Sequence, residues 1–423
     1  MRVLLIAANT EHITMLTLPL GLGLVAAATR RAGHEVTFLD LLTVVDPLEA
    51  VRQAIQQARP EVIGISVRNI DDQSHSSPRM LVAKVGDVVA QCRAHSAAPI
   101  VLGGPGYSIF PVEVLALLGA DLGVWGDGEE VFPALLERLQ SGQDPLGLPG
   151  VLQRGGRAPA ERASVAGFDV MPLWDDVLTA SLAPTDPELW LPLQSRRGCP
   201  NGCSYCSTER IQGYQIRCRP TQLVAEQVGR LAAAGFRRIY FVDNSFNIPR
   251  SYSVELCQGL QAVTPSVQWR CILYPQHVDE DLVALMAKAG CREVALGFES
   301  GSRRILREMN KRYSPDEVKE TSDLLRKHGI RRFGFLLLGG PGEDRDSVEE
   351  SLAFAAALGL DGLRITVGIR IYPGTPLARR AVADGIIAAD ADLLHPRFYL
   401  APGLDGWIQQ RVTSLAVPPA ARR

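Results

Sequence analysis

Short apolar runs alternate with amphipathic stretches along the first 145 residues. The short runs are typical of strands, and the longer stretches repeat apolar residues at the spacing of helices. The predicted strands cover residues 3–8, 35–41, 62–67, 99–102 and 122–125, and the predicted helices cover residues 21–32, 47–58, 80–95, 112–118 and 129–139. This order predicts an α/β fold with a doubly wound, Rossmann-like parallel sheet.

The alternation of strands and helices resumes with longer units after residue 190. Predicted strands there cover residues 191–195, 238–242, 268–273, 293–296, 332–338 and 362–371. This order predicts a partial (β/α) barrel, in which the strand ends carry the site. The predicted organisation is a first domain at 1–145, a Gly- and Pro-rich linker at 146–190, a second domain at 191–398 and a short C-terminal extension at 399–423.

Composition narrows the class of protein. Of 423 residues, 46% are hydrophobic and 21% are charged, as in ordinary globular enzymes. A formal net charge of −2 provides no basic stripe, so we expect no nucleic-acid partner. No apolar run reaches the roughly 18 residues that span a bilayer, so we expect no membrane partner. Eight scattered cysteines form no disulfide framework, and we expect a cytoplasmic protein.

Polar and glycine-rich segments follow the predicted strands of the first domain. In doubly wound sheets ligands lie beyond these strand ends, and glycines there let backbone amides approach a bulky or phosphate-bearing ligand. The alternative is that the glycines only turn the chain. No G-x-G-x-x-G follows the first strand, so we predict no dinucleotide site. The candidate ligand-binding residues are Asn9, Thr10, Arg68, Asn69, Asp71, Gly103, Gly104, Gly126, Gly128 and Glu129.

Three cysteines with C-x3-C-x2-C spacing, Cys199, Cys203 and Cys206, carry the strongest chemical signal. On a loop interrupted by Gly and Pro, three thiolates can converge on one iron-sulfur cluster and leave one iron open to a substrate or cofactor. A zinc site is the alternative, but it usually needs a fourth Cys or His nearby. Cys218 lies twelve residues beyond the motif, so we predict an iron-sulfur cluster.

The cysteine spacing, with an aromatic residue before the third cysteine, resembles the signature of the radical S-adenosylmethionine (SAM) enzymes. In that family three cysteines hold a 4Fe-4S cluster and SAM chelates the fourth iron. Segments 102–104 and 126–129 resemble the cobalamin-binding domain that precedes the radical SAM domain in one large subfamily. Further segments similar to this subfamily follow in the same order at 243–246, 297–301, 338–343 and 371–377.

The resemblance implies roles for individual residues of the second domain. Tyr205 would pack beside the cluster and the adenine of SAM. Glu299 would accept hydrogen bonds from the ribose or the amino group of SAM, the alternative being a carboxylate that caps the following helix. Arg270 is a candidate for binding the SAM carboxylate. The residues expected near the methionine moiety are Asp243, Asn244 and Ser245.

The sequence lacks a motif that supplies a histidine ligand to cobalt in many cobalamin-binding domains. Many cobalamin-binding domains carry a D-x-H-x-x-G motif whose histidine ligates cobalt, and no such run occurs here. We therefore expect cobalamin without a protein histidine on cobalt, with Arg68 near its lower face. An arginine stays protonated and cannot ligate a metal, so Arg68 would keep other ligands away from cobalt.

The resemblance implies three cofactors, namely a 4Fe-4S cluster, SAM and cobalamin. We predict a cobalamin-dependent radical SAM methyltransferase that acts on an unactivated carbon of a small-molecule or natural-product intermediate. An external electron donor such as flavodoxin or ferredoxin would be a partner. The alternatives are a cobalamin-dependent cyclase or ring-rearranging enzyme without methyl transfer, and a non-catalytic cobalamin or iron-sulfur carrier. Three aromatic residues could face the substrate, Tyr372, Tyr399 and Trp407, but the sequence assigns no catalytic residue.

Overall fold

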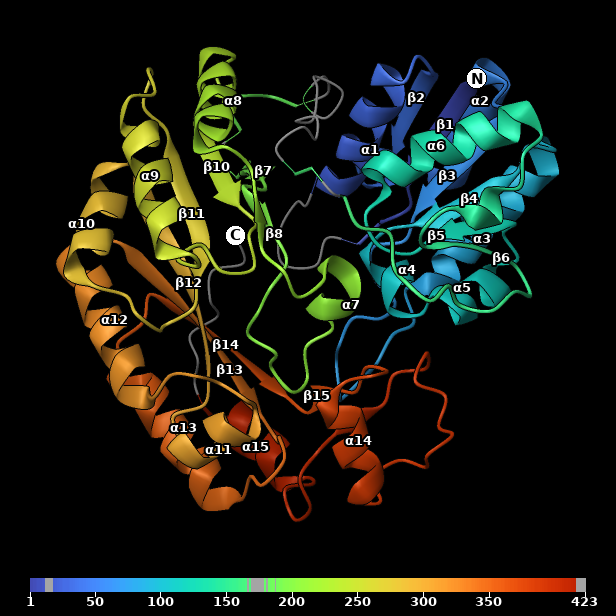
Figure 1. Cartoon of the computed structure of the whole chain (residues 1–423). Helices are drawn as coiled ribbons and strands as arrows, with labels where there is room; N and C mark the ends of the chain where they lie inside the picture. The colour runs from blue at the N-terminus through green and yellow to red at the C-terminus, as the bar shows by residue number, and fades with distance from the viewer. Residues whose placement is uncertain (12–17, 166, 169–178, 180–181, 187, 416–423) are drawn as a thin grey trace.

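The computed structural model describes residues 1–11, 18–165, 167–168, 179, 182–186 and 188–415 (Figure 1). Over these residues the chain forms two α/β units side by side, with the short helix α7 (Thr208–Gln212) between them (Figure 1). Each unit is built on a parallel sheet, so the predicted fold class is confirmed. Among the described helices, none combines the length and the apolarity needed to cross a lipid bilayer.

The first unit contains a six-stranded sheet in the order β2-β1-β3-β4-β5-β6. Neighbouring strands are parallel except β5 and β6, which are antiparallel. Its strands are β1 (Arg2–Ala7), β2 (Glu35–Asp40), β3 (Val62–Ser66), β4 (Ile100–Gly103), β5 (Leu122–Val124) and β6 (Val151–Gln153). Its helices are α1 (Leu20–Arg31), α2 (Pro47–Ala58), α3 (Val82–His95), α4 (Pro105–Ile109), α5 (Pro111–Leu118) and α6 (Gly128–Ser141), with 3-10 turns η1 (Leu41–Thr43) and η2 (Pro145–Gly147).

Alternate residues of β1 enter two different cores. Leu4 and Ile6 belong to the core that includes buried residues of α2, α3 and α5. Val3 and Leu5 belong to the core that includes buried residues of α1 and α6. Because helices cover both faces of the sheet, both sets of side chains are apolar, and the strand appears in the sequence as a continuous apolar run.

The second unit contains six parallel strands in the order β14-β13-β12-β11-β10-β7. The strands are β7 (Leu191–Leu193), β10 (Arg238–Phe241), β11 (Gln268–Leu273), β12 (Cys291–Glu299), β13 (Arg331–Leu338) and β14 (Gly362–Val367). The helices are α8 (Thr221–Ala233), α9 (Arg250–Gln261), α10 (Glu280–Lys288), α11 (Arg303–Glu308), α12 (Pro315–Lys327), α13 (Arg345–Ala357), α14 (Pro376–Ala383) and α15 (Trp407–Ser414). Two short antiparallel ribbons complete the unit, β8 (Arg196–Arg197) with β9 (Arg217–Cys218) and β15 (Ile369–Arg370) with β16 (Phe398–Tyr399).

The strands of the second unit have two unequal faces. On β11, Trp269 and Cys271 are buried in the core that includes residues of α9 and α10, whereas Arg270 and Ile272 on the opposite face are only half-buried. Helices α8, α9, α10 and α12 lie along the outer side of this sheet (Figure 1). The half-buried side chains therefore line the open inner side of a partial barrel, as expected from the sequence.

Some local expectations are wrong. The strand predicted at 362–371 is divided into β14 and β15 at Gly368, which has φ +77°. A Cβ atom at Gly368 would lie 2.9 Å from the side chain of His75, so close packing between the two units ends the strand there. Helix α4 was not predicted, and β6 lies inside the stretch expected to be a linker. The first sheet therefore continues past residue 145.

Loops at the carboxyl ends of the first sheet contact the segments around the cysteine motif. The indole Nε1 of Trp125, directly after β5, donates to the carbonyl oxygen of Arg210 on α7 at 3.1 Å. The Nε of Arg210 donates to the carbonyl oxygen of Ile109 at 3.2 Å. The edge of the first sheet that should carry its ligand therefore faces the loop that carries the three cysteines.

Candidate functional site

The three cysteines lie on the loop 198–216, between β8 and β9. Gly198 begins this loop with φ +99°, and a Cβ atom there would lie only 2.0 Å from the carbonyl oxygen of Gln215, so only glycine fits. The backbone N–H of Cys199 donates to Gly213 O at 3.1 Å, and that of Cys206 donates to Cys203 O at 3.2 Å. All three thiols are free and only partly buried.

The cysteine loop offers three thiols to an iron-sulfur cluster. In the part of the chain that the structure describes, no three His, Cys, Asp or Glu side chains are grouped closely enough to hold one metal ion. A four-iron cluster distributes its cysteines over separate irons, so it needs a wider arrangement than tetrahedral zinc does. Burial is the largest cause that raises the pKa of the Cys199 and Cys203 thiols, and the nearby Lys311 ammonium acts in the opposite direction. The loop residues fit an iron-sulfur cluster.

A buried lysine lies beside the cysteines. The Nζ of Lys311 is 3.3 Å from Glu299 Oε1, and the Lys311 side chain is only 5% exposed. Its ammonium lies 5.3 Å from the ring centroid of Tyr205 and 5.9 Å from that of Tyr313. Burial opposes the charge, but Tyr205, Tyr313 and Glu299 outweigh it and raise the pKa of Lys311. The site therefore contains a lysine, paired with Glu299, that the sequence did not lead us to expect.

The position of Glu299 depends on an irregularity of β12. Glu299 is the last residue of the strand and has φ +61°, and the pairing register with β13 shifts between Gly297 and Glu299. A positive φ is uncommon for a residue with a side chain, and such residues cluster at functional sites. The helix that follows is α11, which brings the chain back to Lys311. The signal in the sequence is the position of Lys311 shortly after the short helix that follows Glu299, because such a helix can return the chain to the end of the strand.

Asp243 has partners other than those expected. Its carboxylate accepts hydrogen bonds from the backbone N–H of Ser195 at 2.8 Å and of Arg196 at 3.1 Å, and it pairs with Arg196 Nε at 3.2 Å. The side chain is completely buried, and burial raises the pKa of its carboxyl. Asp243 therefore holds the base of the cysteine loop from inside the protein. Contact between Asp243 and the methionine moiety of SAM stays a prediction.

Asn244 and Ser245 also serve the loop. The Nδ2 of Asn244 donates to the carbonyl oxygen of Gly198 at 3.2 Å and to Gln212 Oε1 at 2.7 Å, which joins the two ends of the cysteine segment. The hydroxyl of Ser245 donates to the carbonyl oxygen of Asn244 at 2.8 Å. Contact between these residues and SAM stays a prediction.

Arg270 lies inside the barrel, and its contact with the SAM carboxylate stays a prediction. It is the third of six residues of β11, which places it about 10 Å before the strand's carboxyl end at ~3.3 Å per residue. Its guanidinium packs against Trp190 at 4.5 Å and Tyr240 at 4.6 Å and is 3.6 Å from Glu293. Arg270 therefore fills the barrel interior, and Lys311 is the cation near the cysteines.

The glycines at the carboxyl edge of the first sheet differ in how much space lies beside their Cα atoms. A Cβ atom at Gly104 would lie 2.7 Å from Ser66 Oγ, and one at Gly126 would lie 2.2 Å from Ala163 O, so the packing of the loops themselves requires these two glycines. A Cβ at Gly128 would lie 3.1 Å from Val25. At Gly103, by contrast, the nearest atom would be 3.9 Å away, which leaves room for a ligand at the end of β4.

Some polar side chains at this edge of the sheet form no hydrogen bond with the described residues of the protein. Asn9 forms a local turn, with its side chain bonded to the backbone of Glu11. Within the described residues, the side chains of Thr10, Arg68 and Asn69 make no hydrogen bond to the protein. Burial lowers the pKa of Arg68, and the Asp40 carboxylate acts in the opposite direction. Uncommitted donors beside an open glycine position fit a large polar ligand such as cobalamin.

Two acidic residues expected at the ligand instead join the two units. Asp71 Oδ2 pairs with Arg370 Nε at 2.8 Å, and the Asp71 side chain is 1% exposed. Glu129 receives two hydrogen bonds from the Arg197 guanidinium, at 2.8 and 3.2 Å. Both carboxylates are buried at the contact between the units, and their contact with the ligand stays a prediction.

The three aromatic residues considered for substrate contact each interact with another residue of the protein. Tyr372 is buried, and its hydroxyl accepts a hydrogen bond from Gln73 Nε2 at 2.9 Å. The buried Tyr399 donates to Asp384 Oδ2 at 2.5 Å. The ring of Trp407 lies 5.1 Å from the Arg345 guanidinium. These three side chains therefore pack the protein.

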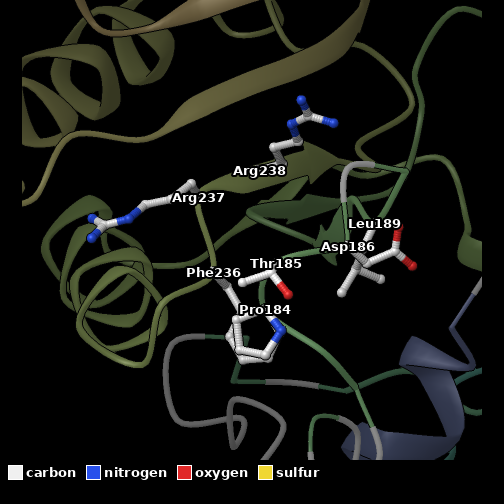
Figure 2. A pocket seen from close by; sticks show the side chains of 7 residues that line it. All are labelled: Pro184, Thr185, Asp186, Leu189, Phe236, Arg237 and Arg238. Carbon is white, nitrogen blue, oxygen red and sulfur yellow. The ribbon is translucent and has the colours of Figure 1, made fainter.

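A cavity of about 180 Å³ lies at the amino end of β10, where the side chains of Arg237 and Arg238 point in different directions (Figure 2). Its lining combines residues before β7 with residues at the start of β10: Pro184, Thr185, Asp186, Leu189, Phe236, Arg237 and Arg238. None of the residues predicted for the site lines it. The cavity is thus at the opposite end of β10 from the cysteine loop.

Sequence comparison divides the chain as the fold does. The B12 binding domain family matches residues 6–136, and the Radical SAM superfamily matches residues 193–355. The order of the two matches is the order of the two α/β units.

Full-length similarity extends to named methyltransferases. The chain is 25% identical to an uncharacterized methyltransferase of Pyrococcus horikoshii, over 92% of this chain and 84% of that protein. It is 23% identical to the tryptophan 2-C-methyltransferase of Streptomyces laurentii, over 89% of this chain and 74% of that protein. The structure of the radical SAM methyltransferase TsrM from Kitasatospora setae, with tryptophan and a SAM analog bound, matches with a TM-score of 0.84 at 22% identity, covering 96% of this chain and 87% of that one. At this identity the structural match establishes the shared fold.

Proposed function

The chain joins a B12-binding domain to a radical SAM domain, and on this premise we propose that it is a cobalamin-dependent radical SAM methyltransferase that methylates carbon. The substrate class is a small molecule or natural-product intermediate with an unactivated carbon. One observation carries the proposal, namely that the loop with Cys199, Cys203 and Cys206 faces the carboxyl edge of the first sheet. Two cofactors bound there would share one space between the units.

Three cysteines and two charged groups would hold the cluster and SAM. We assign Cys199, Cys203 and Cys206 to the cluster. Glu299 and Lys311 offer a carboxylate for the SAM amino or ribose groups and an ammonium for its carboxylate, which suits a zwitterionic amino-acid moiety. When bound, the cluster supplies the electron that cleaves SAM into methionine and a 5′-deoxyadenosyl radical, and cobalamin supplies the methyl group.

Arg68 is the residue that we assign to the lower face of cobalamin. It lies two residues after the end of β3, and among the described residues its guanidinium has no hydrogen-bond partner. A charged guanidinium cannot ligate cobalt, so its action would be to exclude water and other ligands. The one histidine of the same loop, His75, packs its ring against Phe398 at 5.5 Å. This arrangement supports cobalamin without a histidine on cobalt.

The chemistry requires two partners outside the chain. One is the small-molecule substrate. The inner face of the barrel presents half-buried apolar side chains such as Ile272, Phe335 and Leu337, which suits an apolar or aromatic group of that substrate. The other is an external one-electron donor such as flavodoxin or ferredoxin, since the cluster must be reduced before it can cleave SAM.

Mass spectrometry of products tests the proposal. The protein is reconstituted anaerobically with iron, sulfide and cobalamin and is incubated with reductant, candidate metabolites and SAM that carries a deuterated methyl group. The expected result is 5′-deoxyadenosine together with a product that has gained one labelled methyl group. A product that has been rearranged without gaining the label would contradict methyl transfer. The absence of both SAM cleavage and product, in protein that holds both cofactors, would contradict catalysis altogether.

A further inference from the structure

The cysteine loop has a narrow neck. Strands β8 and β9 form an antiparallel ribbon in which Arg197 stands directly opposite Arg217. All three cysteines lie between these two arginines in the chain, so the ribbon is the base from which the whole loop extends. Any movement of the neck would move the three cysteines together.

Without a neighbouring carboxylate, the pairing of β8 with β9 would be destabilised. Like charges directly opposite each other on paired strands repel, and these two guanidiniums are largely buried, with 7% and 15% of their side chains exposed. Water therefore screens the repulsion only weakly. A carboxylate between the two arginines offsets this repulsion and stabilises the pairing of the strands.

Asp127 provides that carboxylate from the other unit. Its Oδ1 lies 3.0 Å from Arg197 Nη1, and its Oδ2 lies 2.6 Å from Arg217 Nη1. Asp127 follows β5 and immediately precedes α6, so it is anchored in the B12-binding domain. Its backbone N–H donates to Ala163 O at 3.0 Å, and its Oδ2 also accepts the N–H of Val165 at 3.1 Å. These two hydrogen bonds to the segment 163–165 hold Asp127 and its carboxylate in place.

Glu129 supports only half of this arrangement. It binds Arg197 through both carboxylate oxygens, and no hydrogen bond or ion pair joins it to Arg217 in the described structure. Asp127 alone bridges both sides of the neck with one carboxylate. It sits at the carboxyl edge of the first sheet, the edge to which we assign cobalamin.

We propose that Asp127 is a positioning residue that fixes the cysteine loop, and with it the iron-sulfur cluster, relative to cobalamin. The inference rests on the proposed function, because it presumes that both cofactors bind. Its physical basis is that one rigid group in the first domain closes the neck of the loop in the second. Removing the charge of Asp127 would leave Arg217 buried without its carboxylate partner and would release the β9 side of the neck, so the loop could shift although its cysteines stay intact.

The test compares Asp127→Asn with Asp121→Asn. Asparagine keeps the shape of the side chain and removes its charge. Asp121 precedes the same strand β5 at its other end, where it pairs with Arg93 at 2.5 Å and is 33% exposed, so its replacement is a matched control. Asp127→Glu, which restores the charge, serves as the conservative variant. Arg217→Gln provides a second test should Asp127→Asn fail to fold, because it removes the ion pair between Asp127 and β9 while Arg197 keeps both Asp127 and Glu129 as partners.

Three measurements are made on protein reconstituted with iron, sulfide and cobalamin. Electron paramagnetic resonance measures how strongly the reduced cluster accelerates spin relaxation of cob(II)alamin, which depends on the distance between the two centres. In Asp127→Asn this effect should weaken, and transfer of the labelled SAM methyl group to cobalamin should fall about tenfold or more, because misplacement by ~1 Å can slow a reaction 100-fold. Abortive formation of 5′-deoxyadenosine should stay close to the wild-type rate.

The outcomes separate positioning from a general structural role. The control Asp121→Asn should match the wild type, and Asp127→Glu should recover part of the methyl transfer. Unchanged spin relaxation and methyl transfer in Asp127→Asn or Arg217→Gln, with both cofactors bound, would overturn the inference. An equal loss in Asp121→Asn would overturn it as well. Wild-type protein that binds neither cofactor would instead contradict the proposed function.

Discussion

The cysteines of the loop 198–216 are only partly buried, whereas four others lie within the hydrophobic cores, Cys92, Cys257, Cys271 and Cys291. Burial raises the pKa of Cys92 to about 12 and that of Cys257 further. A thiol binds iron only as the thiolate, so Cys92 and Cys257 stay protonated, and the buried core cysteines act as small apolar side chains. Exposure therefore separates the two kinds of cysteine.

Replacing any one of Cys199, Cys203 and Cys206 by alanine should abolish cluster absorbance and SAM cleavage. Each cysteine holds its own iron, and a cluster with two protein ligands is labile. Iron analysis of the reconstituted protein should fall from about four irons per chain toward zero. Cys218→Ala is the control, because Cys218 lies on β9 beside the loop but outside the motif. Wild-type iron content in a variant that lacks all three cysteines would disprove the assignment.

Replacing Arg68 by alanine should leave cobalamin bound but let water ligate the cobalt. In the proposed role, the guanidinium would exclude ligands without forming a bond to the metal, so its removal should open that face. The cob(II)alamin spectrum should change, and methylation of cobalamin by SAM should slow. In the wild type, no nitrogen superhyperfine splitting is expected. An unchanged spectrum and an unchanged methylation rate in Arg68→Ala would contradict this role, and Arg68→Lys tests whether charge alone suffices.

Among the loops at the barrel mouth, the one after β13 depends on a single buried carboxylate. Glu343 Oε2 accepts the backbone N–H of Gly340 at 2.7 Å and also that of Gly339. The other oxygen of Glu343 is buried and has no hydrogen-bond partner in the described structure. Burial raises the pKa of Glu343 to about 7, which the two N–H donors only partly offset.

This loop should make stability depend on pH. Because the carboxyl pKa is higher in the folded than in the unfolded state, the folded protein binds the proton more tightly. The contribution of Glu343 to stability is therefore greatest below the unfolded pKa of 4.5 and declines as the pH rises to about 7. The total decline is about 3 kcal/mol, from 1.36 kcal/mol per pKa unit. Denaturant unfolding of the cofactor-free protein between pH 5 and pH 8 measures it.

Glu343→Gln should remove this pH dependence, because glutamine does not titrate. Glu350→Gln, an exposed position on the helix that follows, is the matched control and should keep the wild-type profile. Parallel pH profiles for wild type and Glu343→Gln would show that Glu343 is not the titrating group.

In the whole molecule, charges at the contact between the units fix how the two domains meet. Asp71 and Arg370 are 299 residues apart in the chain, and their buried side chains approach to 2.8 Å. The Arg370 guanidinium also donates to the backbone carbonyl oxygens of Ile371 and Leu393. Asp127 and Glu129 both pair with Arg197 and form a second buried charge cluster at the contact. The Asp71 cluster lies after β3, and the Asp127 cluster lies after β5.

Asp71→Ala should lower the free energy of unfolding by about 3–5 kcal/mol, because it leaves Arg370 buried without its counter-charge. Asp316→Ala is the control. Asp316 pairs with Arg303 at the same distance, 2.8 Å, but both side chains are more than half exposed, so its loss should cost far less. Denaturant unfolding measures both variants. Equal effects would show that the contact between the units adds nothing to the stability of this pair.

The sequence by itself determined the fold class, the order of the two domains and the cysteine motif. These features are local, since strand and helix periodicity and the spacing of Cys199, Cys203 and Cys206 are set by neighbours along the chain. The boundaries were less certain. Strand β6 and the break at Gly368 depend on packing against distant segments, which leaves no mark in the local pattern.

Only the tertiary structure decided which charged residues are free for a cofactor. Asp71, Glu129 and Asp243 all follow strands, as ligand-binding carboxylates do, yet each is neutralised by an arginine. Lys311 lies in no predicted strand end, yet it reaches Glu299. A charge that pairs internally has the same local sequence as one that binds a ligand, and the contact between distant segments is what distinguishes them.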